Sequence, residues 1–263
     1  MNSKKFNVFL NSKIGPFNKT IQVDADKSLS IRSFLIGSIS EKISTTKNIL
    51  ESEDVKSTIN ACKKLGVKIK RIKTGKYKIF GKGLGCFYAK KNTSLNVGNS
   101  GTLARLLIGI LSTTPDINIK VTGDSSLNKR NMKELINLMS KFGASFLPKK
   151  KYFLPFKIIS SCMPVGIDYK AGESAQLKSA VMFAGLNSYG ITTIEEKIKS
   201  RDHTENLLIK NTQSIKIKKG SKKIIKIFGK KNLKTLEIKV GGEQSSEAYF
   251  TALTLLNKYS LIK

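Results

Sequence analysis

Residues 98–112 read GNSGTLARLLIGILS, a small polar cluster followed by an apolar stretch long enough for roughly three helical turns. Asparagine and serine are typical of helix N-termini, where their side-chain oxygens bind free backbone N–H groups. The apolar residues that follow lie on nearly every side of a helical projection, which predicts a buried helix. This segment is the clearest instance of a pattern that returns along the chain.

The same pattern occurs four times. Successive segments begin 72, 75 and 70 residues apart, and the other three are DKSLSIRSFLIGSIS at 26–40, ESAQLKSAVMFAGL at 173–186 and EQSSEAYFTALTLL at 243–256. A period near 72 residues is longer than that of common solenoid repeats. It fits a small α/β unit that is repeated.

A second, more polar helix is predicted in each of the first three units, at 54–66, 132–143 and 202–210. The first two segments show helical spacing of apolar residues and end at Gly66 and Gly143, a common signal at helix C-termini. Short runs with β propensity come next, such as VKIKRIK and KIIKIFG. Each unit is therefore expected to contain a helix, a strand, a second helix and further strands.

The starts of the predicted buried helices are candidate anion-binding sites. Free N–H groups and the helix dipole attract anions at such a start. The first three starts also carry cations, which are Lys27 with Arg32, Arg105, and Lys178. Ordinary capping explains one such motif, whereas several converging starts would form an anion-attracting cleft.

Lysine dominates the charge of the chain. Of 263 residues, 48 are Lys or Arg and 18 are Asp or Glu, for a net charge of +30. Nucleic-acid surfaces commonly use arginine for bidentate contacts, and only five arginines occur, at 32, 71, 105, 130 and 201. We interpret the scattered lysines as compositional drift and do not expect nucleic acid as a partner.

The remaining composition excludes several classes of protein. Cys62, Cys86 and Cys162 give neither a disulfide framework nor a zinc spacing and suit a reducing compartment. With His203 as the one histidine, a His-rich metal site is not expected, and we predict no metal and no cofactor. No apolar run reaches the ~18 residues of a membrane span, so a cytoplasmic protein without a membrane partner is expected.

The fourth segment is followed by only a few residues, since the sequence ends at Lys263. A lone helix with an apolar face has nothing to bury it. We therefore expect either a chain that is cut short or one that another polypeptide completes.

Five motifs resemble those of one enzyme family in the same order. They are DKSLSIR at 26–32, NVGNSGTLARLLIGIL at 96–111, VTGDSSLNKRNM at 121–132, ESAQLKSAVMFAGL at 173–186 and SRDHTENLL at 200–208. The family is 5-enolpyruvylshikimate-3-phosphate (EPSP) synthase, or 3-phosphoshikimate 1-carboxyvinyltransferase. Four of the five arginines lie in these motifs.

The resemblance implies an inverse α/β fold of repeated βαβαββ units around buried helices. It implies one full domain of three units at 23–240, the start of a second domain at 241–263, and a segment at 1–22 that belongs with the second domain. A full-length member is expected to be monomeric.

The resemblance also implies a reaction, in which the enolpyruvyl group of phosphoenolpyruvate moves to the 5-hydroxyl of shikimate-3-phosphate on the route to chorismate and aromatic amino acids. The residues implied for shikimate-3-phosphate are Lys27, Ser28, Arg32, Ser174, Ala175, Gln176, Ser200 and Arg201. Those implied for phosphoenolpyruvate are Lys27, Asn99, Gly101, Arg130 and Gln176. Lys27 is the one catalytic group implied, by electrostatics, because the family's acid and base residues belong to the second domain.

Structural roles stay open for some of these residues. Ser28 and Ser174 could be plain helix caps, Arg105 could pin its own helix, and residues 202–205 could form a capping network in which His203 transfers no proton. Three other interpretations of the whole chain are also open. They are a non-catalytic polyanion-binding protein on the same fold, a UDP-N-acetylglucosamine enolpyruvyl transferase, and a degraded gene product that does not fold. The transferase is disfavoured because residues 112–130 contain no cysteine.

Overall fold

A computed structural model describes residues 14–211 and 213–263. These residues form two compact units, which are Ala25–Gly241 and a smaller unit that combines residues up to Asp24 with Gly242–Lys263. The first part of the segment predicted at 1–22 lies outside the described residues. The domain boundaries that the sequence suggests stay predictions.

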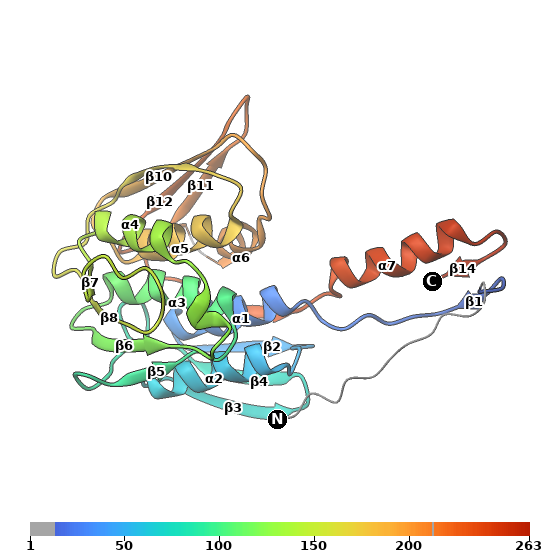
Figure 1. The fold of residues 1–263 in the computed structure, drawn as a ribbon, viewed down its shortest axis with the longest axis horizontal. Helices are drawn as coiled ribbons and strands as arrows, with labels where there is room; N and C mark the ends of the chain where they lie inside the picture. Colours follow the sequence, from blue (N-terminus) through green and yellow to red (C-terminus); the bar gives the residue numbers. More distant parts are fainter. Residues whose placement is uncertain (1–13, 212) are drawn as a thin grey trace. The chain divides into compact units, whose positions relative to one another are not determined.

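The larger unit consists of one arrangement repeated three times (Figure 1). Its buried helices are α1 (Lys27–Ile39), α3 (Gly101–Thr113) and α5 (Ala175–Leu186), and its more polar helices are α2 (Glu53–Lys64), α4 (Lys133–Lys141) and α6 (His203–Asn211). A short 3-10 helix, η1 (Leu127–Lys129), precedes α4. Each predicted helix of this unit is therefore present, and Gly66 and Gly143 follow α2 and α4 with φ of +90° and +95°.

Each repeat also supplies strands to one four-stranded sheet. The strands are β2 (Ile43–Lys47), β3 (Lys68–Lys73) and β4 (Lys76–Phe80) in the first repeat, β5 (Ser94–Asn96), β6 (Asn118–Thr122), β7 (Ser145–Leu147) and β8 (Phe156–Ile159) in the second, and β9 (Asp168–Ala171), β10 (Ile191–Glu196), β11 (Ile215–Lys218) and β12 (Lys223–Phe228) in the third. A last strand, β13 (Glu237–Lys239), ends the unit.

The three sheets share one topology, with strand orders β13-β2-β4-β3, β5-β6-β8-β7 and β9-β10-β12-β11. In each sheet the first two strands are parallel and the other pairings are antiparallel. The first repeat takes its leading strand from the far end of the unit, since β13 pairs with β2 and Glu237 lies opposite Thr45. The predicted fold class, repeated βαβαββ units around buried helices, is confirmed.

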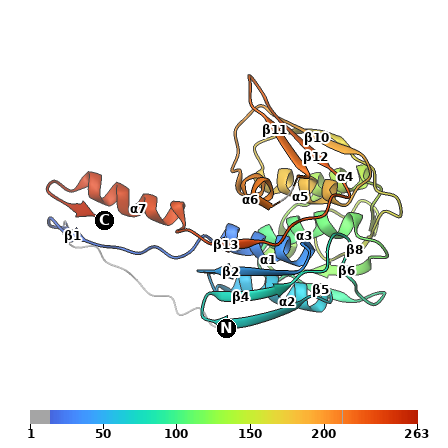
Figure 2. The same cartoon turned by 180° about the vertical axis from the view of Figure 1, so that it is seen from behind.

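The core lies where α1, α3 and α5 meet among the three sheets, as Figures 1 and 2 show. Nearly the whole circumference of each helix is buried, as its apolar sequence predicts. α3 and α5 approach closely at Gly109, where an added Cβ would lie 2.6 Å from the backbone oxygen of Ala180. This close packing brings the starts of two helices near each other.

The smaller unit contains a parallel pair of two-residue strands, β1 (Asn18–Lys19) and β14 (Leu261–Ile262), and the helix α7 (Gln244–Leu256). The predicted helix is present. Its apolar sequence is typical of a buried helix, yet no residue of α7 is buried, which agrees with the expectation that this helix has nothing to bury it. Tyr249, Leu255 and Leu256 are 79%, 82% and 83% exposed. Within this unit, two short strands offer too little surface to cover an apolar helix.

Among the described residues, none of the helices combines the length and apolar character that crossing a bilayer requires.

Candidate anion-binding site

The three buried helices begin with side-chain caps. Ser100 Oγ accepts from Leu103 N at 3.2 Å in α3, and Ser174 Oγ accepts from Leu177 N at 3.3 Å in α5. In α1 the cap is Asp26, whose Oδ1 accepts from Leu29 N at 2.6 Å. The capping role left open for Ser174 is therefore confirmed, whereas Ser28 lies inside α1. The first backbone N–H groups of each helix, such as that of Ala175, have no acceptor within the helix.

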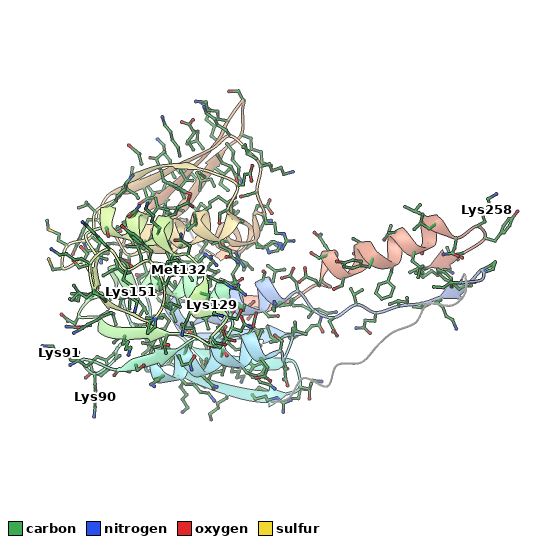
Figure 3. The ribbon with its side chains drawn as sticks, viewed as in Figure 1. Lys90, Lys91, Lys129, Met132, Lys151 and Lys258 are labelled. Atoms are coloured by element: carbon green, nitrogen blue, oxygen red, sulfur yellow. The ribbon has the colours of Figure 1, made fainter. Side chains whose placement is uncertain are left out.

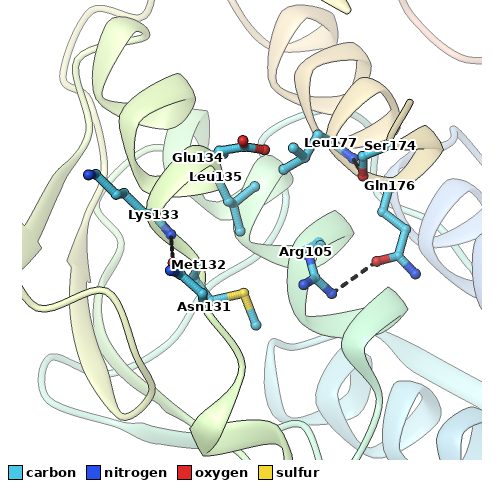
Figure 4. Close-up of a pocket in the computed structure, with 9 residues that line it drawn as sticks. All are labelled: Arg105, Asn131, Met132, Lys133, Glu134, Leu135, Ser174, Gln176 and Leu177. Carbon is cyan, nitrogen blue, oxygen red and sulfur yellow. Dashed lines mark hydrogen bonds between the residues drawn. The ribbon is translucent and has the colours of Figure 1, made fainter. Parts of the chain in front are cut away.

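Gln176 joins the starts of α3 and α5. Its Nε2 donates to Thr102 Oγ1 at 2.9 Å, and its Oε1 accepts from Arg105 NH1 at 2.9 Å. Arg105 NH1 also lies 3.3 Å from the carbonyl oxygen of Gly101, within its own helix. Arg105 thus pins its helix, as expected, and in addition fixes the amide of Gln176 (Figure 4).

Two guanidinium groups lie over Gly101. A Cβ added there would lie 2.7 Å from Arg130 NH1 and 3.0 Å from Arg105 NH1. Arg130 NH2 donates to Asn99 Oδ1 at 3.3 Å. Burial lowers the pKa of Arg105, and the positive charge of Arg130 lowers it further. Among the described residues, the hydrogen-bond partners of both arginines are uncharged, so this pair of cations is suited to an anion.

A pocket of about 440 Å³ opens next to these groups (Figure 4). Two of the predicted ligand residues, Ser174 and Gln176, line it. The complete lining is Arg105, Asn131, Met132, Lys133, Glu134, Leu135, Ser174, Gln176 and Leu177. Its size suits a small molecule, although the carboxylate of Glu134 makes one side unfavourable for an anion.

Arg32 joins α1 to α5 and α6. Its Nε donates to Thr204 Oγ1 at 2.8 Å, its NH1 to the carbonyl oxygen of Ser28 at 3.0 Å, and its NH2 to Ser179 Oγ at 3.3 Å. The side chain is buried, and burial lowers its pKa to about 10. A guanidinium has five N–H groups, so donors remain beyond these three bonds.

The other predicted residues have partners of their own. Lys27 Nζ lies 3.1 Å from Asp54 Oδ2, with about half of the lysine side chain exposed. Ser200 donates to Glu196 Oε1 through its backbone N at 3.0 Å and its Oγ at 2.7 Å. Arg201 is exposed and follows Ser200 directly.

The segment at 202–205 spans the start of α6. α6 begins at His203, and the Oδ1 of the preceding Asp202 accepts from Asn206 Nδ2 at 3.0 Å. Burial lowers the pKa of His203, and its Nδ1 is buried without a hydrogen-bond partner among the described residues. Nothing in this geometry assigns the imidazole a proton transfer.

The structure thus joins the predicted residues into two groups. One group is Asn99, Gly101, Arg130 and Gln176, and the other is Ser28 with Arg32. α5 contributes to both, through Gln176 and Ser179.

Sequence reasoning assigned no role to several residues that build the site. Thr102 and Ser179 lie within the quoted motifs, so their position there was a signal, and Thr204 was considered only as part of a capping network. Glu196 lies outside the motifs. It follows Thr192 and Ile194 at every second position of β10, and both of these residues are buried. That period of two would have placed Glu196 on the inner face.

A family model described as EPSP synthase (3-phosphoshikimate 1-carboxyvinyltransferase) matches residues 12–262. The chain belongs to the EPSP synthase family. The 3-phosphoshikimate 1-carboxyvinyltransferase of Novosphingobium aromaticivorans is 37% identical over 245 residues, which are 92% of this chain and 55% of the relative. That of Petrotoga mobilis is 37% identical over 247 residues, or 93% of this chain and 56% of the relative.

Solved structures agree with this family. EPSP synthase from Acinetobacter baumannii superimposes with a TM-score of 0.83 at 33% identity, over 94% of this chain and 55% of the other. The chain therefore spans about half the length of the relatives it matches.

Proposed function

We propose that this chain is the part of a 3-phosphoshikimate 1-carboxyvinyltransferase that holds shikimate-3-phosphate and one side of phosphoenolpyruvate. In this reaction the 5-hydroxyl oxygen adds to the enol carbon of phosphoenolpyruvate while the methylene is protonated. The tetrahedral adduct then loses phosphate and a methyl proton, which restores the double bond. The cytoplasmic location and the monomeric state of the complete enzyme stay predictions.

The observation that carries the proposal is the pair of guanidiniums over Gly101, next to the starts of α3 and α5. Each reactant brings a phosphate and a carboxylate, so the site needs cations and N–H donors, and cations without a protein carboxylate as partner suit it best. Arg105 and Arg130 have uncharged hydrogen-bond partners among the described residues. Holding both reactants together would also lower the entropic barrier.

The proposed roles follow the two groups of residues. Asn99, Gly101 and Arg130 face phosphoenolpyruvate, and Gln176 of the same group touches both substrates. Shikimate-3-phosphate is held by Ser28, Arg32, Ser174, the backbone of Ala175, Ser200 and Arg201. Lys27, at the start of α1, acts electrostatically on both substrates.

Calorimetry tests this proposal on the 263-residue chain. We expect shikimate-3-phosphate to bind and Lys27→Ala to weaken its affinity about tenfold or more, because a charge-assisted hydrogen bond is lost. Lys56→Ala is the matched control, since Lys56 is exposed and pairs with Glu53 on the surface of α2 at 2.8 Å. Binding that is absent, or that Lys27→Ala leaves unchanged, would contradict the proposal.

A further inference from the structure

A buried ion network lies next to Ser200 and Arg32. Lys178 of α5 is fully buried, and its Nζ lies 2.6 Å from Oε1 of Glu196 and 2.6 Å from Oε1 of Glu205. Lys223 Nζ lies 3.2 Å from Glu196 Oε2 and 3.2 Å from Glu205 Oε1. The two lysines and two glutamates balance in charge, which offsets the cost of burying them.

Glu196 also holds the loop that follows β10. Its Oε1 accepts both the backbone N–H and the hydroxyl of Ser200. An ionised carboxylate only accepts hydrogen bonds, so the Ser200 hydroxyl is the donor in this pair. Oε1 of Glu196, which is itself held by Lys178, therefore positions both the backbone and the side chain of Ser200.

Glu205 extends the network to α6. The neighbouring residue, Thr204, accepts from Arg32 Nε at 2.8 Å, and its hydroxyl lies 2.8 Å from that of Ser179. The network thus holds Ser200 directly and supports the helix turn that fixes Arg32. Both are residues that the proposed function places on shikimate-3-phosphate.

We infer that Glu196 is a positioning residue for shikimate-3-phosphate, acting through Ser200 and the adjoining Arg201. This inference rests on the proposed function for its ligand. Glu196 is 2% exposed and acts through the loop. Without its carboxylate, the Ser200 N–H and hydroxyl lose a charged acceptor, and the loop samples positions that do not fit the ligand.

Hydrogen exchange tests the anchoring without any ligand. In Glu196→Gln we expect the amides of residues 197–203 to exchange about tenfold faster, because a neutral acceptor replaces a charged one. Glu195→Gln is the matched control, since Glu195 is the neighbouring residue of β10 and pairs with Lys222 at 2.8 Å on the more exposed face. Unchanged exchange of residues 197–203 in Glu196→Gln would overturn the inference.

Calorimetry with shikimate-3-phosphate then tests the ligand role. We expect affinity to fall about tenfold in Glu196→Gln and to stay within about twofold in Glu195→Gln. The double variant Lys178→Met/Glu196→Met removes one charge of each sign, leaves Lys223 with Glu205, and should recover stability. Its affinity should remain low, because the acceptor of Ser200 is still missing.

The outcomes separate the inference from the proposed function. If the unmodified chain does not bind shikimate-3-phosphate, the proposed function fails and the ligand role fails with it, while hydrogen exchange still decides whether Glu196 anchors the loop. If the unmodified chain binds and the stable double variant binds equally well, the positioning role is wrong and the proposed function stands.

Discussion

Gly101 and Gly109 lie in the same helix, α3, but an added methyl group would meet different surroundings. At Gly101 it would approach the ends of two arginine side chains, which are able to move. At Gly109 it would lie 2.6 Å from the backbone oxygen of Ala180 in α5, which is fixed. We expect Gly101→Ala to change the free energy of unfolding by less than about 1 kcal/mol, and Gly109→Ala to lower it by about 1–3 kcal/mol.

Urea unfolding of the two variants measures both free-energy changes. Equal losses of stability would contradict the geometry over Gly101. A displaced Arg130 should also weaken phosphoenolpyruvate binding in Gly101→Ala without a loss of stability.

At the residue scale, local structural roles could be predicted from the sequence, whereas long-range contacts could not. Ser174 and Arg105 were correctly given possible structural roles, because capping and pinning depend on residues within four positions in the same helix. The side-chain partners of Arg32 are Ser179 and Thr204, which lie 147 and 172 residues away along the chain. No local pattern contains that pairing.

At the element scale, the network that joins β10, α5 and α6 should make folding sensitive to acid. Burial alone would raise the pKa of Glu196, but hydrogen bonds from Lys178 and Ser200 outweigh it and lower the pKa from 4.5 to about 2. Protonation therefore favours the unfolded chain. The stabilisation, on the order of 3 kcal/mol, is complete above pH 4.5 and is lost as the pH falls toward 2.

Unfolding curves between pH 6 and pH 3 measure this effect. Glu196→Gln should lose less stability over that range than the unmodified chain, because its amide does not titrate. Glu51, whose pKa is lowered to about 2 mainly by its hydrogen bond from Arg71, titrates in both proteins and cancels. Parallel pH curves would show that Glu196 contributes nothing to acid sensitivity.

The sequence predicted the helices because apolar spacing and terminal glycines are local signals. It did not predict that β13 completes the first sheet. β13 has three residues, and its partner β2 lies near the other end of the unit, so the pairing depends on the fold of everything between them. The exposure of α7 agrees with the expectation that nothing covers its apolar face, since burial depends on what packs against a helix.

At the scale of the whole molecule, lysines lie directly opposite one another in each of the three sheets. Lys70 pairs with Lys78, Lys120 with Lys157, and Lys216 with Lys226. Elsewhere, Lys90 and Lys91 extend into solvent (Figure 3). Like charges directly opposite one another destabilise a sheet, so the net charge of +30 adds no stability there. These lysine-rich strand pairs are the competing surface for any anion.

The most direct test of the central claim is an NMR titration of the 263-residue chain with shikimate-3-phosphate. The central claim is that the starts of the buried helices, and not the lysine-rich sheets, bind the phosphorylated ligand. We predict that amide shifts change at Ser28, Ala175, Gln176 and Ser200, while those of the paired lysines in β3–β4, β6–β8 and β11–β12 stay unchanged. Shifts that spread over these strands and disappear in moderate salt, with none at the helix starts, would contradict the claim.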